Sequence, residues 1–127
     1  MEREIISTEG APKAIGPYSQ GVRAGGFLFL SGAIALDPKT GELAGGGIAP
    51  ETEQVMRNIE ALLKAAGLGF ADVVKCVIYL ADMGDFAKVN EIYGGYFREN
   101  PPARVTVEVK GLPRGAKVEI EVTACCG

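Results

Sequence analysis

The chain has 127 residues, which fits a single domain over residues 1–127, and it carries a formal net charge of −3 with no basic run. This charge balance argues against nucleic acid as an electrostatic partner. The absence of histidine excludes Ser-His-Asp and Cys-His catalysis and argues against a ribonuclease with a histidine base. No secretory signal or membrane-length apolar stretch is present, so a cytoplasmic location is expected.

The first third of the chain predicts three strands. Residues 4–7 form a short first strand, and a proline-containing loop leads into a second strand over residues 18–24. The Gly25-Gly26 pair predicts a hairpin turn into a third strand over residues 27–32. Because that strand is apolar on both sides, both of its faces should be covered.

The middle of the chain predicts two helices separated by a strand. Residues 50–66 carry apolar side chains at helical spacing, and Gly67 suits the C-cap. Residues 73–80 predict a strand that is apolar on both faces except for Lys75, with Cys76 as a small core residue. A second helix begins at Asp82 or Gly84. Its apolar positions at helical spacing are Phe86, Val89, Ile92, Tyr93 and Phe97.

The last third predicts two strands with strict alternation. Residues 104–109 place Arg104, Thr106 and Glu108 on one side and three valines on the other. Residues 117–125 alternate in the same way. Arg104 follows a Pro-Pro pair at the start of its strand, and a guanidinium held on a rigid strand suits bidentate binding of a carboxylate or phosphate. The alternative is that Arg104 is a solvated charge on the sheet face.

The predicted order β-β-β-α-β-α-β-β leaves one face of the sheet without helices. Two helices can cover only one face, so a partner subunit is the expected cover of the other, and we predict an obligate oligomer. If Val105, Val107, Val118 and Ile120 pack under the helices, the polar side chains fall on the second face. These polar residues are Arg104, Thr106, Glu119 and Glu121. Charges near an interface need pairing, either in a ligand pocket or in a structural salt bridge.

Several motifs together resemble the reactive intermediate deaminase family, also called the YjgF family. The most specific is Pro102-Ala103-Arg104 with its following Val-Glu-Val, together with Glu119-Ile120-Glu121 near the end. The second is Ile15-Gly16-Pro17-Tyr18. Leu30-Ser31-Gly32, Asn58, Ala66-Gly67, Asp85-Phe86 and Val89-Asn90 recur with them, so the resemblance covers nearly the whole chain.

The resemblance implies an α+β fold like that of chorismate mutase. A mixed six-stranded sheet would carry two helices on one face and form a homotrimer through the other. The final strand would lie between the third and fourth strands, leaving the Arg104 strand at an edge, although local sequence alone suggests a hairpin between the last two strands. The pockets would lie between neighbouring subunits.

The resemblance also implies an activity that needs no metal and no cofactor. Family members hydrolyse enamines and imines such as 2-aminoacrylate and 2-aminocrotonate, which pyridoxal-phosphate dehydratases release, to 2-keto acids and ammonia. The expected partners are therefore a small imine or keto acid and further copies of the same chain, with no nucleic acid and no membrane.

Carried over residue by residue, the resemblance implies roles for eight positions. Arg104 would bind the substrate carboxylate, Glu119 would hold the attacking or proton-carrying water, and Tyr18 would line the pocket and join a proton relay. The remaining substrate-binding residues are Ser31 and Gly32 through their backbone, Thr106 through its hydroxyl, and Phe86 and Asn90 in the wall. Thr106 departs from the family, since many members carry cysteine there, so covalent cysteine chemistry is unavailable at that position.

Simpler structural roles remain open for most of these residues. Glu119 could form an interface salt bridge, Tyr18 could be a packed tyrosine, and Ser31 could matter only through its backbone. Phe86 could be plain core, and Asn90 could cap backbone. Two further functions are also open, namely binding of small carboxylic acids without turnover and an RNA-directed endoribonuclease role. The charge balance and the absence of histidine make the RNA role the weaker of the two.

Overall fold

The strands and helices follow one another in the predicted order. The computed structural model describes residues 2–127. Its elements are β1 (Glu4–Ile6), β2 (Gly21–Ala24), β3 (Phe27–Leu30), α1 (Ile48–Ala65), β4 (Val73–Leu80), α2 (Phe86–Gly94), β5 (Ala103–Glu108) and β6 (Val118–Cys125). Short 3-10 turns lie at Phe70–Asp72, Met83–Asp85 and Pro113–Gly115. Among residues 2–127, no helix is both long and apolar enough to cross a membrane.

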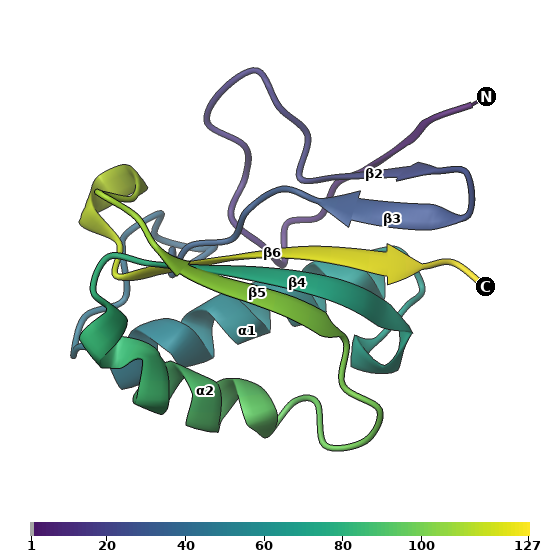
Figure 1. The fold of residues 1–127 in the computed structure, drawn as a ribbon. Coiled ribbons are helices and arrows are strands. Elements are labelled where there is room, and N and C mark those ends of the chain that lie inside the picture. The colour runs from purple at the N-terminus through teal and green to yellow at the C-terminus, as the bar shows by residue number, and fades with distance from the viewer. Residues whose placement is uncertain (1) are drawn as a thin grey trace.

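The six strands form one mixed sheet in the order β1-β2-β3-β6-β4-β5. Only β4 and β5 pair in parallel, and the other neighbours are antiparallel. The final strand β6 therefore lies between β3 and β4, and β5 is an edge strand (Figure 1). This confirms the topology that the family resemblance implied and rules out the local alternative of a β5–β6 hairpin.

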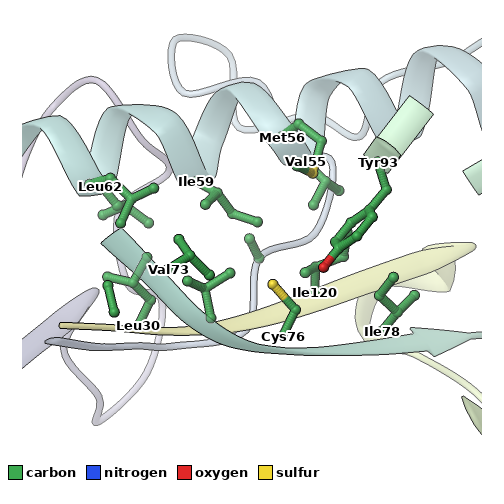
Figure 2. Packing of buried hydrophobic residues seen from close by; sticks show 14 of the residues in the cluster. Leu30, Val55, Met56, Ile59, Leu62, Val73, Cys76, Ile78, Tyr93 and Ile120 are labelled. Carbon is green, nitrogen blue, oxygen red and sulfur yellow. The ribbon is translucent and has the colours of Figure 1, made fainter. Parts of the chain in front are cut away.

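Both helices cover the same face of the sheet, and the core lies between the two layers (Figure 1). Figure 2 shows Val55, Ile59 and Leu62 of α1 pointing toward side chains of the sheet such as Ile120 and Val73. Each of these five residues is at most 6% exposed. The helical spacing of the apolar residues thus buries one stripe of α1, as predicted.

The opposite face of the sheet carries exposed apolar side chains, and we call it the open face. Its large apolar residues are Ile5, Phe27, Phe29, Val105 and Val107, each 37–50% exposed. In β3 the phenylalanines alternate with Leu28 and Leu30, which are buried under the helices. The predicted strand with two apolar faces is therefore confirmed, and within one chain only one of those faces is covered.

The orientation of β5 is the reverse of the prediction. Val105 and Val107 were expected under the helices, but they lie on the open face, and Arg104 and Thr106 face the helix layer. The parallel register explains this, because it sets Arg104 beside Cys76 and Thr106 beside Ile78, both of which are buried in the core. The strand is at the edge, where the helix layer leaves room for a polar side chain.

The orientation of β6 agrees with the prediction. Val118, Ile120 and Val122 are at most 2% exposed under the helices, whereas Glu119 and Glu121 alternate with them toward the open face. Glu121 accepts a hydrogen bond from the Tyr79 hydroxyl across the strand pair at 2.8 Å.

Both helices have bounds that differ from the predicted ones. Helix α1 begins at Ile48, which places Pro50 inside the first turn, where a missing N–H costs no hydrogen bond. Helix α2 ends at Gly94, so Phe97 lies beyond it, although the phenylalanine is still only 8% exposed. Beyond Gly94 the Gly95 and Tyr96 amides donate to the carbonyls of Ile92 and Tyr93, three residues back, so the α-helix tightens before the chain leaves it. The chain that follows still fills the core.

Candidate functional site

The Arg104 guanidinium is held at the edge of the sheet by residues of α2. Its Nη1 donates to the Asn90 side-chain oxygen at 2.7 Å. The guanidinium carbon also lies 5.5 Å from the centre of the Phe86 ring and 5.1 Å from that of Tyr93. A guanidinium favours aromatic faces because their π electrons attract positive charge. Asn90 and two rings thus fix the direction of this cation.

No carboxylate neutralises Arg104 within residues 2–127, where the salt bridges are Arg23–Glu4 and Lys88–Glu91. The side chain is exposed, and an amide oxygen is its hydrogen-bond partner. A guanidinium has five N–H donors, so donors remain for a bidentate anion. This arrangement is suited to recognising a carboxylate, and we call Arg104, Asn90, Phe86 and Tyr93 the arginine cluster.

Polar groups without partners lie on the core side of the arginine cluster. The Thr106 hydroxyl and the Tyr93 hydroxyl are buried and make no hydrogen bond within residues 2–127. Figure 2 shows the Tyr93 hydroxyl directed toward the Cys76 sulfur. Burial raises the pKa of the Cys76 thiol, with Tyr93 and Arg104 acting in the opposite direction. Burial also raises the pKa of Tyr93, so both groups stay protonated and neutral near pH 7.

A second group of predicted residues borders one cavity of about 360 Å³. Tyr18, Ser31, Gly32 and Glu119 all line it. The walls are completed by apolar side chains, including Ile34, Leu36 and Leu62, and by polar ones, including Gln20 and Asn58. Four of the eight predicted site residues are therefore brought together here, and we call this space the Glu119 cavity.

Glu119 and Gly32 are in direct contact in this cavity. A Cβ atom placed on Gly32 would lie only 1.9 Å from Oε2 of Glu119. Only glycine therefore leaves room for the carboxylate at this point. Burial, together with the charge of Glu121, raises the pKa of the Glu119 carboxyl. A raised pKa makes this carboxylate a stronger proton acceptor than an ordinary glutamate.

Of the backbone amides around Ser31 and Gly32, some donate hydrogen bonds to other residues and one does not. The Ser31 amide donates to the Gln20 carbonyl at 3.0 Å, and its hydroxyl donates to the Ser19 carbonyl at 2.6 Å. The Ala33 amide donates to the Ile120 carbonyl at 2.9 Å. Between them, the exposed Gly32 makes no amide hydrogen bond to residues 2–127, so its N–H is available to a ligand. The Ser31 hydroxyl, in contrast, is used to hold the loop.

Tyr18 lies at the rim of the Glu119 cavity and is 51% exposed. Its hydroxyl accepts only a long contact of 3.5 Å from the Ile15 amide. Within one chain, Tyr18 is therefore neither buried nor held by a short hydrogen bond to its hydroxyl. The ring is free to contact a ligand or a second chain.

The arginine cluster and the Glu119 cavity are not brought together within one chain. Arg104 pairs in register with Cys76 and faces the helix layer, whereas Glu119 pairs with Tyr79 and points to the other face. One chain therefore carries two separate parts of the predicted site. A site that uses both parts requires two copies of the chain.

Two residues with clear positioning roles were not predicted. Tyr93 was expected only as an apolar helix position, yet it stacks on Arg104. The spacing of Phe86, Asn90 and Tyr93 places all three on one face of α2, which could have identified the arginine cluster. Gln20 was also missed: its side chain donates to the carbonyls of Thr8, Ala11 and Pro12 and accepts from the Thr8 amide. It thereby fixes the loop that borders the cavity.

Within residues 2–127, no group of three or more His, Cys, Asp or Glu side chains is placed to hold a metal ion. Cys76 is buried alone, while Cys125 and Cys126 are partly exposed near the C-terminus, and all three are free thiols.

Comparison with known proteins gives consistent matches over the whole chain. The endoribonuclease L-PSP family matches residues 8–126. A RutC family protein of Pyrococcus horikoshii is 56% identical over 122 residues, covering 96% of this chain and 97% of that protein. The 2-iminobutanoate/2-iminopropanoate deaminase of Mus musculus is 50% identical over 125 residues, covering 98% and 93%. The crystal structure of a putative endoribonuclease from Thermotoga maritima superposes with a TM-score of 0.95 at 46% identity, covering 98% of each chain.

Proposed function

The chain belongs to the endoribonuclease L-PSP family, known also as the YjgF or reactive intermediate deaminase family, and from this premise we propose that it hydrolyses reactive 2-enamine and 2-imine acids to 2-keto acids and ammonia. The observation that carries the proposal is the uncompensated Arg104 guanidinium, fixed by Asn90 and by aromatic rings. Two mammalian relatives that are named 2-iminobutanoate/2-iminopropanoate deaminases and are 49–50% identical in sequence support the proposal.

The proposed reaction begins with the carboxylate of the substrate on Arg104. The Gly32 amide donates a further hydrogen bond and orients the C=N carbon. Glu119 accepts a proton from a water molecule, whose oxygen then attacks that carbon while the imine nitrogen gains a proton. The tetrahedral carbinolamine collapses with loss of ammonia and leaves the 2-keto acid. Tyr18, at the rim, is placed to join the proton relay.

The proposed site is shared between subunits of a homotrimer. The arginine cluster of one copy would meet the Glu119 cavity of the next, which explains why the two parts lie on different faces of the sheet in a single chain. The open face, with Phe27, Phe29, Val105 and Val107 exposed, would be covered in that assembly. An interface of this kind would also exclude water around the ion pair and strengthen it.

Endoribonuclease activity, which the family name and some relatives' names suggest, has less support in this chain. The net charge is −3, and histidine, the usual base for RNA cleavage, is absent. The residues available for acid–base work are the carboxyl of Glu119 and the hydroxyl of Tyr18, which suit hydrolysis of an already electrophilic imine.

A coupled assay tests the proposed function. A pyridoxal-phosphate threonine or serine dehydratase generates the enamine, and semicarbazide traps the imine that forms from it. The wild-type protein should speed formation of the keto acid and suppress the semicarbazone. Arg104→Ala should lower kcat/KM by about 100-fold or more, because the substrate carboxylate loses its charged partner.

Arg98→Ala is the matched control, since it removes an exposed arginine that lies outside both parts of the site. It should keep wild-type activity. A wild-type protein that binds 2-ketobutyrate but does not speed hydrolysis would instead identify a carboxylic acid binding protein, and wild-type turnover in Arg104→Ala would refute the proposed mechanism.

A further inference from the structure

The Glu119 cavity is larger and more cationic than a three- or four-carbon imine requires. Its volume is about 360 Å³, which is within the range of pockets that hold much larger ligands. Lys13 and Arg114 border it, and Glu119 is the only acidic residue in its lining. The chain as a whole has more acidic than basic residues, so this local excess of positive charge runs against its composition.

Arg114 is held in an unusual backbone conformation at this cavity. Its φ of 62° is in the left-handed region, and Asn100 is the only other non-glycine residue with positive φ in the described chain. Asparagine adopts this conformation readily, whereas arginine does so rarely. Strained residues of this kind concentrate at functional sites because the surrounding structure must enforce them. The backbone strain at Arg114 therefore supports a functional role for this residue independently of the positive charge of the cavity lining.

The Arg114 side chain is tethered without being neutralised. Its Nη2 donates to the Gly41 carbonyl at 3.3 Å, and no carboxylate within residues 2–127 forms a salt bridge with it. The turn Pro113–Gly115 leads directly into β6, which carries Glu119. The backbone of Arg114 is therefore joined closely to the strand of the proposed catalytic carboxyl, and most donors of its guanidinium remain free.

We propose that Arg114, with Lys13, binds a second carboxylate, so that the protein accepts 2-imino acids with an acidic side chain. This inference rests on the proposed function. Arg104 of a neighbouring copy would hold the first carboxylate, and the side-chain carboxylate of a dicarboxylic imine would reach Arg114. The reaction is the same hydrolysis as for the smaller imines: 2-iminoglutarate and water give 2-ketoglutarate and ammonia. Reactions that oxidise the amino group of acidic amino acids to an imine are the class that would supply such substrates.

The test compares two imines on the same protein. Amino acid oxidases with catalase generate 2-iminoglutarate from glutamate and 2-iminopropanoate from alanine, and semicarbazide trapping reports hydrolysis of each. The measured quantity is the ratio of kcat/KM for 2-iminoglutarate to that for 2-iminopropanoate. Arg114→Asn keeps a residue that tolerates positive φ and removes the charge, and it should lower this ratio by about tenfold. Arg114→Lys should retain most of it.

Lys110→Asn is the charge-matched control, because it removes an exposed cation outside the cavity and should leave the ratio unchanged. An unchanged ratio in Arg114→Asn, or wild-type hydrolysis of 2-iminopropanoate without 2-iminoglutarate, overturns this inference alone. If the wild-type protein prefers the imine of leucine to 2-iminoglutarate, the cavity accommodates apolar side chains instead, and this result would also overturn the inference. A wild-type protein inactive on every imine would refute the proposed function itself.

Discussion

Contact between Glu119 and Gly32 is the tightest constraint in the candidate site. Because a Cβ on Gly32 would lie 1.9 Å from Oε2 of Glu119, Gly32→Ala must push the carboxylate away from its position. We expect kcat for imine hydrolysis to fall by about 100-fold, as is typical when a catalytic group is displaced by about 1 Å. Steady-state kinetics measure this directly. Gly45→Ala, where no atom lies within 4 Å of the added Cβ, should keep wild-type kcat. An active Gly32→Ala would show that the position of Glu119 does not matter.

The raised pKa of Glu119 has a consequence for stability. Burial, and secondarily Glu121, raises this pKa, so the native state binds a proton more tightly than the unfolded chain does. The stability contributed by the protonated form is present below the unfolded pKa and is lost as pH rises through the native pKa. Glu119→Gln should therefore raise stability more at neutral pH than at about pH 4. Denaturant unfolding at both pH values measures this, with the exposed Glu99→Gln as control. An equal effect of Glu119→Gln at both pH values would contradict it.

The sequence selected residues that the structure places together, and it placed Glu119 on the correct side of the sheet, but it placed Arg104 on the wrong side. Motif resemblance selected Glu119 and Gly32, and the structure brings both to one cavity with Tyr18 and Ser31. The side of the sheet on which Arg104 lies was wrong, because alternation states which residues share a face and not which face is covered. That choice depends on pairing with β4 and on the aromatic residues of α2, and both are tertiary contacts.

The end of α1 shows how an element's boundary follows from one residue. Gly67 has a φ of 76°. Its amide donates to the Lys64 carbonyl, and the Leu68 amide donates to the Leu63 carbonyl. This is the Schellman pattern, which needs a left-handed residue after the helix. Gly67→Ala should destabilise the protein by about 1 kcal/mol, measured by denaturant unfolding. Gly94→Ala, inside α2 with open space around it, should be neutral or stabilising. The reverse ranking would refute this account of the C-cap.

Element types and their order were predictable because hydrophobic period is a local property. Strand β4 has the predicted bounds, and the Gly67 cap was correctly placed. The pairing of β6 with both β3 and β4 was available only from family resemblance, since it joins segments far apart in the chain. The 3-10 turn before α2 was not predicted; there the Asp82 side chain accepts from the Gly84 amide and delays the helix until Phe86.

At the scale of the whole molecule, the open face is the main unexplained surface of a single chain. Phe29 at its centre is 48% exposed beside Phe27. Phe29→Glu would place a charge there, and we expect it to convert the wild-type assembly to monomers without loss of secondary structure. Sedimentation, with circular dichroism as the check of folding, measures both. Met83→Glu, at a 41% exposed apolar position in the turn before α2, should leave assembly unchanged. A monomeric wild-type protein would contradict the proposed trimer.

The most direct test of the account is complementation between two inactive variants. Arg104→Ala and Glu119→Gln would each form inactive assemblies, and they would be mixed in equal amounts, unfolded and refolded together. If each site takes Arg104 from one copy and Glu119 from its neighbour, random mixing restores about a quarter of the sites, and activity returns to about that fraction of wild type. Mixed assemblies that form but remain inactive would show that the two parts do not work together across subunits, and the proposed site would be wrong.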